Sequence, residues 1–193
     1  MNHQNSPVSS PRRMTARTLA YCALLAAISV VLARLIIPMP NVTTRFSLEA
    51  VPIFMAGMLF GPVAGGLVGF TADAVGCLFS GFGYNPIFCV PPILYGVFGG
   101  VFRRWLGKGV TLPRLLASML PPVIVGSILW QSAALAFIYN SKGTFQLSLI
   151  YFLSSRSLQF AITIVLDVLV IFLLFRAKIF DRLGVWPPKS NKS

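Results

Sequence analysis

The longest apolar stretch of the chain, residues 145–175, reads FQLSLIYFLSSRSLQFAITIVLDVLVIFLLF. Only two of its side chains, Arg156 and Asp167, carry a charge. A helix of this length would measure about 46 Å, whereas the hydrocarbon core of a bilayer is about 30 Å thick. The stretch therefore predicts a membrane-spanning helix that tilts or protrudes from the bilayer.

The remainder of the 193-residue chain has the same character, because 56% of all residues are hydrophobic and only 10% are charged. Soluble domains carry about 25% charged residues. With a mean hydropathy of +0.80, the composition predicts an all-α integral membrane protein, a bundle of six transmembrane helices. The helices are predicted over residues 18–37, 46–60, 63–79, 87–102, 112–139 and 145–175. We expect a membrane domain over 17–176, between a disordered cytoplasmic tail (1–16) and a basic cytoplasmic tail (177–193).

Lysine and arginine positions predict the orientation. With the N-terminus in the cytoplasm, twelve of the 16 basic residues fall in cytoplasmic segments, namely Arg12, Arg13, Arg17, Arg103, Arg104, Lys108, Arg114, Arg176, Lys178, Arg182, Lys189 and Lys192. The other four fall at or near the outer face, namely Arg34, Arg45, Lys142 and Arg156. This asymmetry follows the positive-inside rule and predicts that both termini are cytoplasmic. It also accounts for the formal net charge of +12 without a nucleic-acid partner.

Most enzyme classes are excluded by missing groups. The only histidine is His3, and the chain has neither a GxSxG motif nor a phosphate-binding GxxxxGK[ST] loop. We therefore predict a protein that is not an enzyme and has no metal site, no cofactor and no ATPase site of its own. Cys22, Cys77 and Cys89 lie in apolar stretches without metal-ligand spacing, so we expect them to be small core residues.

Ionisable groups inside or beside the predicted helices are functional candidates, because each is costly to hold in hydrocarbon. They are Arg34, Arg45, Glu49, Asp73, Arg156 and Asp167. A structural role is the alternative for some of these groups. Arg34 could extend to the outer membrane surface, and Arg45 could pair with Glu49 four residues later. For Asp167 we expect pairing with a cytoplasmic arginine.

The arginines that gather toward the outer face predict a pocket for an anionic ligand, because guanidinium groups bind carboxylates through two hydrogen bonds. Aromatic side chains nearby would suit a flat ring, and Asp73 or Glu49 would accept hydrogen bonds from N–H groups of that ring. The predicted ligand-binding residues are Arg34, Arg45, Glu49, Asp73, Tyr84, Asn85, Trp130, Arg156 and Gln159.

Small residues form two stripes at helical spacing, Ala16, Ala20, Ala23 and Ala27 in the first predicted helix, and Gly57, Gly61, Gly65 and Gly69 in the second and third. Such stripes let another helix approach closely. We expect the glycines to pack inside the molecule. The alanines are equally suited to an internal contact or to a partner protein.

Several segments together carry a resemblance to a known family. They are ALLAAISVVLAR (residues 23–34), VPI (51–53), AGMLFGP (56–62), GFTAD (69–73), LYG (94–96), Leu129-Trp130, Tyr139, Lys142 and Arg156. In their order and spacing, the sequence resembles the substrate-binding S components of energy-coupling factor (ECF) vitamin transporters, most closely the folate-specific members. The resemblance covers about residues 17–176.

This resemblance implies a six-helix subunit of the bacterial cytoplasmic membrane that captures folate, or another vitamin, from outside. It also implies partners: a membrane coupling subunit, and two ATPase subunits that use ATP to drive import. The family's AxxxA docking motif matches Ala23 and Ala27. Two alternatives remain from other classes, a stand-alone secondary transporter with Asp73 and Asp167 as a proton relay, and a structural membrane protein without a ligand.

Overall fold

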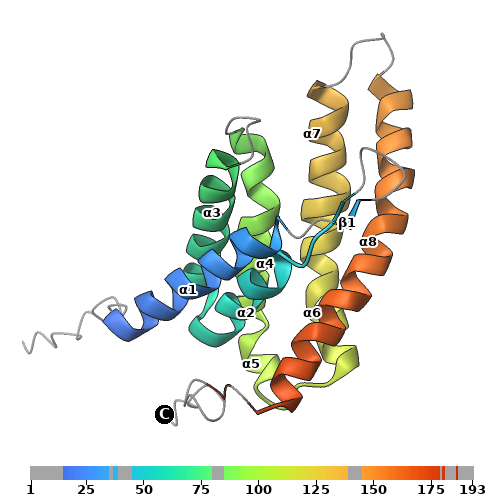
Figure 1. Cartoon of the computed structure of the whole chain (residues 1–193). Helices are drawn as coiled ribbons and strands as arrows, with labels where there is room; N and C mark the ends of the chain where they lie inside the picture. The colour runs from blue at the N-terminus through green and yellow to red at the C-terminus, as the bar shows by residue number, and fades with distance from the viewer. Residues whose placement is uncertain are drawn as a thin grey trace, which may run out of the picture.

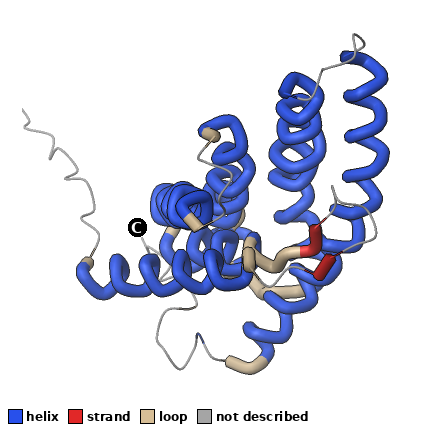
Figure 2. Tube along the Cα trace, turned by 45° about the horizontal axis from the view of Figure 1, so that its top comes forward, coloured by secondary structure: helices blue, strands red, loops and turns tan. Residues whose placement is uncertain are grey.

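Helices form nearly all of the part of the chain that the computed structural model describes, which is residues 15–34, 37–38, 45–79, 85–138, 145–178, 180 and 186 (Figures 1 and 2). In chain order the elements are α1 (Ala16–Leu32), β1 (Ile37–Pro38), β2 (Arg45–Phe46), α2 (Ala50–Phe60), α3 (Pro62–Leu78), the 3-10 helix η1 (Pro86–Cys89), α4 (Val90–Val101), α5 (Arg103–Leu106), α6 (Leu112–Pro122), the π-helix η2 (Val123–Trp130), α7 (Gln131–Ile138) and α8 (Phe145–Arg176).

The first two predicted helices are too long at the ends that face each other. The helix predicted over 18–37 ends at Leu32, and the helix predicted over 46–60 begins at Ala50. Between them, β1 and β2 form a short antiparallel pair in which Ile37 lies opposite Phe46. Ile37 precedes Pro38, and a residue before proline is biased away from the helical conformation toward the extended one.

A sharp break separates α2 from α3. Gly61 has a φ of 106°, in the region that favours glycine, and Pro62 occupies the first turn of α3. Proline is well suited to that position because its missing N–H would have no partner in a first turn. The predicted break at Gly61-Pro62 is confirmed.

Glycines bring α2, α3 and α4 into backbone contact. A Cβ atom added at Gly57 or Gly65 would collide with the carbonyl oxygen of Gly96, and one at Gly69 would collide with that of Pro92. The contacts are reciprocal, because a Cβ at Gly96 would strike the carbonyl oxygen of Gly65. The glycine stripe therefore packs inside the molecule, as predicted.

The predicted helix over 112–139 is a continuous run of α6, η2 and α7. It contains Pro121 and Pro122, which have no N–H to donate to the preceding turn. The hydrogen-bonding pattern widens to that of a π-helix immediately after them. The run lies beside α8, which returns in the opposite direction (Figure 1).

Two helical stretches of the described chain are long and apolar enough to cross a membrane, Leu112–Ile138 and Leu149–Arg176. Four shorter apolar helices accompany them, Ala16–Leu32, Ala50–Phe60, Pro62–Leu78 and Pro86–Val101. Large apolar side chains also point outward, among them Leu78 (80% exposed), Phe137 (74%) and Leu158 (70%). An outer surface of this kind is expected where it faces lipid rather than water.

Candidate functional site

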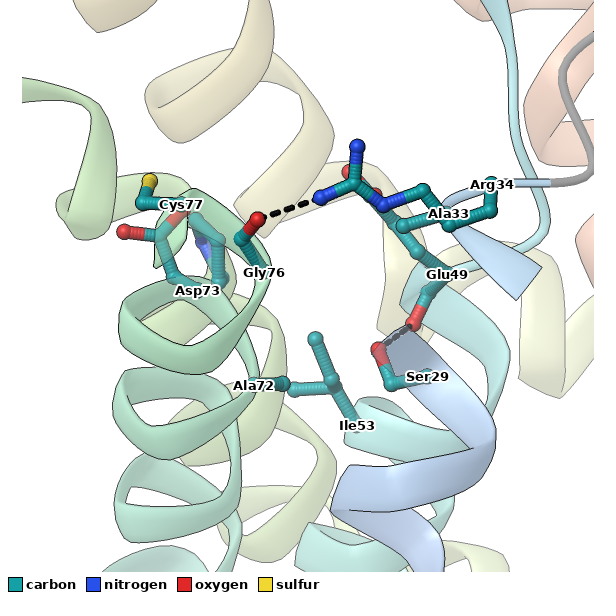
Figure 3. Close-up of a pocket in the computed structure, with 10 residues that line it drawn as sticks. Ser29, Ala33, Arg34, Glu49, Ile53, Ala72, Asp73, Gly76 and Cys77 are labelled. Carbon is teal, nitrogen blue, oxygen red and sulfur yellow. Dashed lines mark hydrogen bonds between the residues drawn. The ribbon is translucent and has the colours of Figure 1, made fainter. Parts of the chain in front are cut away.

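A pocket of about 230 Å³ lies where α1, α2, α3 and α4 meet (Figure 3). It brings together three of the predicted ligand-binding residues, Arg34, Glu49 and Asp73. The complete lining is Ser29, Ala33, Arg34, Glu49, Ile53, Ala72, Asp73, Gly76, Cys77 and Pro92.

Arg34 joins the ends of two helices at this pocket. It follows α1, and its guanidinium donates a hydrogen bond to the carbonyl oxygen of Gly76, in the last turn of α3 (Figure 3). A cation is stabilised at a helix C-terminus, where carbonyl groups lack partners within the helix. Arg34 is therefore held across the pocket by α3.

One carboxyl group precedes α2, and the other lies in the second half of α3. Glu49 is the residue before α2, and its backbone carbonyl accepts a hydrogen bond of 2.8 Å from the hydroxyl of Ser29 on α1. Asp73 lies on α3 and accepts a hydrogen bond from the thiol of Cys89, while its Oδ2 atom is buried without a hydrogen-bond partner. A buried acceptor without a partner is unusual, and a ligand N–H group would satisfy it.

Charge and size together define what the pocket could hold. Its lining carries two carboxyl groups and one guanidinium, so hydrogen-bond acceptors outweigh cations. Pockets for drug-sized ligands are usually about 300–1,000 Å³, larger than this one. The pocket therefore suits a ring-sized part of a ligand that carries N–H donors.

A second polar group lies along α8. Arg156, Gln159 and Thr163 follow one another at helical spacing, and the latter two side chains are each 8% exposed. The Arg156 guanidinium lies 5.3 Å from the ring centre of Phe160, and its Nε atom is buried without a hydrogen-bond partner. Within the described residues Arg156 forms no ion pair, so its charge is available to an anion.

Two further predicted residues meet at the start of α4. Trp130 donates a hydrogen bond of 2.8 Å from Nε1 to the carbonyl oxygen of Ile87, and the side chain of Asn85 accepts one of 3.1 Å from the backbone N–H of Ile87. Trp130 thus joins η2 to η1, and Asn85 caps the start of η1. Neither lines the pocket of Figure 3, and neither do Arg156 and Gln159.

Two predicted residues cannot be placed in a site. Tyr84 lies outside the described residues. Arg45 is described in its backbone only, as part of β2, so the expected pairing with Glu49 stays a prediction.

Seven residues of the lining were not predicted, among them Ser29, Gly76 and Cys77, and neither was the contact of Cys89 with Asp73. Asp73, Gly76 and Cys77 lie three and four residues apart, so helical spacing alone could have indicated a shared face. Cys22 and Cys89 are buried as expected, but Cys77 is partly exposed and lines the pocket.

The expected pairing of Asp167 with a cytoplasmic arginine is wrong. Its side chain is 1% exposed, and its Oδ1 atom has no hydrogen-bond partner. The reason is the rotation of α8, which turns Asp167 into the core, whereas Arg176 at the end of the same helix is exposed.

The predicted docking residues lie on an open face. Ala23 and Ala27 are both exposed on α1, which packs against α2 and α3 (Figure 1). Leu24 and Val31 on the same helix are also more than half exposed. No described element of the chain covers this face.

Comparison with known proteins identifies a family and a relative that this chain resembles. A family model described as "ECF-type riboflavin transporter, S component" matches residues 13–177. The folate transporter FolT of Clostridium novyi (strain NT) is 32% identical over 101 residues, which make up 51% of this chain and 56% of that relative. The match thus spans little more than half the length of the curated relative.

Solved structures with the same fold cover most of the chain. A crystal structure of FolT bound with folic acid superposes with a TM-score of 0.69 at 24% identity, covering 83% of this chain and 93% of that one. ThiT from Listeria monocytogenes gives 0.60 at 18% identity over 83% and 94%. An S-component for biotin from an ECF-type ABC transporter gives 0.54 at 22% over 85% and 95%. At these identities the likeness shows the fold alone.

Proposed function

Since the chain belongs to the family of ECF-type transporter S components, we propose that it is the vitamin-binding subunit of an ECF-type, ATP-driven importer and that its vitamin is folate. The observation that carries the choice of folate is the 32% identity to FolT of Clostridium novyi (strain NT). The family model is named for riboflavin, which makes riboflavin the first competing ligand to test.

The proposed binding mode uses two groups of side chains for two chemical ends of folate. The acceptors of the pocket, Glu49 and the buried Oδ2 atom of Asp73, receive N–H donors of the pterin ring. Arg156, whose buried Nε atom has no partner, receives a carboxylate at the other end, and Arg34 completes the pocket that it lines with Glu49 and Asp73. The predicted residues Arg45, Tyr84, Asn85, Trp130 and Gln159 complete the proposed site.

We propose that residues 17–176 form a six-helix bundle in the bacterial cytoplasmic membrane, with residues 1–16 and 177–193 as cytoplasmic tails. The partners would be a membrane coupling subunit, which docks on Ala23 and Ala27, and two ATPase subunits. ATP would be hydrolysed by these partners and not by this chain. The family membership and the exposed face of α1 support this arrangement.

Calorimetric titration of the purified, detergent-solubilised chain tests the ligand. Folate is expected to bind tightly and one to one, while riboflavin, thiamine and biotin do not. Tight binding of riboflavin instead would retain the S-component function and overturn the choice of folate. Uptake by the chain alone in proteoliposomes, abolished by a protonophore, would favour a secondary transporter.

Substitutions then test the binding mode. Removing a charged hydrogen-bonding partner costs about 1.5–3 kcal/mol, so Arg156→Ala and Asp73→Asn should each weaken folate binding roughly 10- to 100-fold. Ser157→Ala is a matched control, because Ser157 is exposed and bonds only to its own helix, at the carbonyl of Ser154. Unchanged affinity in Arg156→Ala would refute the proposed carboxylate contact.

Cys77 offers an independent readout of the pocket. Cys22 and Cys89 are only 6% and 3% exposed, so a maleimide should react mainly with Cys77. Bound folate is expected to slow this labelling, and biotin is not. Equal labelling rates with and without folate would place the ligand elsewhere.

A further inference from the structure

The carboxyl group of Asp167 is buried in the core at a place that the proposed ligand site does not use. The side chain is 1% exposed, and its Oδ1 atom is buried without a hydrogen-bond partner. Its neighbours on the buried face of α8 are Thr163, Ile164, Val168 and Ile171, and the hydroxyl of Thr163 donates its hydrogen bond to the carbonyl oxygen of Gln159 in its own helix. Arg156 lies about 16 Å away along the helix, eleven residues earlier.

No cation faces this carboxyl group from the described elements packed against α8, which are α2, α6, η2 and α7. Neither α2, η2 nor α7 contains a charged residue. The charged residue of α6 is Arg114, at its start, where its guanidinium donates to a backbone carbonyl. The groups that act on Asp167 or respond to it electrostatically are Glu49, before α2, and the phenol of Tyr95 on α4.

A carboxylate in such a place would be an isolated negative charge in a low-dielectric core. The cost of burying an unpaired ion is large enough that ionisable groups become neutral instead. With Glu49 and Tyr95 as its titratable neighbours, Asp167 has no positive partner that would hold it ionised.

We propose that Asp167 is a proton-binding site in the membrane core, which holds one proton in the folded protein. The site is separate from the proposed folate site and does not depend on it. The bound proton is part of the folded structure, so the chain takes it up when α8 packs against α2 and α6. A stationary proton of this kind differs from a relay, which needs a second group within transfer distance.

The chain has so few acidic residues that the bound proton can be observed directly by infrared spectroscopy. The sequence contains only four acidic residues, Glu49, Asp73, Asp167 and Asp181. In infrared spectra a protonated carboxylic acid absorbs above the amide band, well apart from a carboxylate. The full chain in lipid nanodiscs at neutral pH is expected to show this acid band, and Asp167→Asn is expected to lose it.

Three matched variants assign the band. Glu49→Gln, Asp73→Asn and Asp181→Asn each remove one of the other carboxyl groups, and all should retain the Asp167 band. The proposal is overturned if the wild-type chain shows no acid band, or if the band disappears in one of these three variants but persists in Asp167→Asn. If Asp167→Asn does not fold, Asp167→Glu should keep the acid band at a displaced frequency.

Discussion

The hydrogen bond between Tyr95 and Ser127, 3.0 Å between their hydroxyl oxygens, joins α4 to η2 inside the core. Both side chains are buried, at 6% and 2% exposure. Ser127→Ala would leave the phenol hydroxyl without a partner, which costs about 1–3 kcal/mol. We expect a lower melting temperature for Ser127→Ala, measured by thermal unfolding in detergent.

The double variant Tyr95→Phe/Ser127→Ala is the control for this pair. Because it removes both polar groups, its loss of stability should be smaller than the sum of the two single losses. Strictly additive losses would show that the two hydroxyl groups do not stabilise each other.

Single residues also show where sequence reasoning is sufficient and where it is not. Arg34, Glu49 and Asp73 were predicted because a charge in an apolar helix is costly, and the structure places them around one pocket. Cys77 gave no such signal, since a neutral thiol costs little to bury. The environment of Asp167 depends on the rotation of α8, which the apolar residues on all sides of that helix leave undetermined.

At the scale of helices, the contact between α3 and α4 predicts a large effect from one methyl group. In Gly96→Ala the new Cβ would strike the backbone carbonyl of Gly65, which cannot move without its helix. Overpacking of this kind costs about 1–3 kcal/mol, so we expect a clear loss of thermal stability.

Gly76→Ala is the matched control on α3, because a Cβ there meets no atom within 4 Å. Alanine favours the helical conformation over glycine by about 1 kcal/mol, so this variant should be as stable as the wild type or more stable. Equal destabilisation by Gly96→Ala and Gly76→Ala would indicate that α3 and α4 do not pack as described.

The locations of the helices could be predicted from the sequence more accurately than the residues at which they begin and end. Long apolar runs and the Gly61-Pro62 break located the helices, but β1, β2 and η2 gave no clear pattern. The pairing of Ile37 with Phe46 joins segments on either side of a loop, and the π-helix depends on how the chain compensates for Pro121 and Pro122. The strand pairing depends on contacts between separate segments, and the two prolines indicate a distorted helix without specifying which form it takes.

At the scale of the whole molecule, the open face of α1 predicts separate effects on assembly and on ligand binding. Ala23→Leu/Ala27→Leu adds bulk where the described chain leaves space, so the subunit should fold and bind folate with unchanged affinity. Assembly with the proposed coupling and ATPase subunits should be lost, as measured by co-purification from detergent. Such contacts between small residues depend on close approach of the helices.

Val63→Leu is the control, because it enlarges a side chain that is 73% exposed on another helix, α3. It should leave assembly intact. Normal co-purification of Ala23→Leu/Ala27→Leu would mean that the partners dock elsewhere, and failure of Val63→Leu would mean that any added bulk is harmful.

The helices of this molecule differ greatly in length, and the bilayer must respond to that difference. The 11 residues of α2 extend about 16 Å and the 17 of α3 about 25 Å, whereas the 32 of α8 extend about 48 Å. Figure 1 shows α7 and α8 rising past the end of α3. Because α2 is buried inside the molecule, it is α3 and α8 that face lipid; the bilayer would have to thin beside α3 and thicken beside α8, unless the protein tilts. The length of the lipid acyl chains should therefore determine the tilt of the subunit, and a change in lipid composition alone would change that tilt.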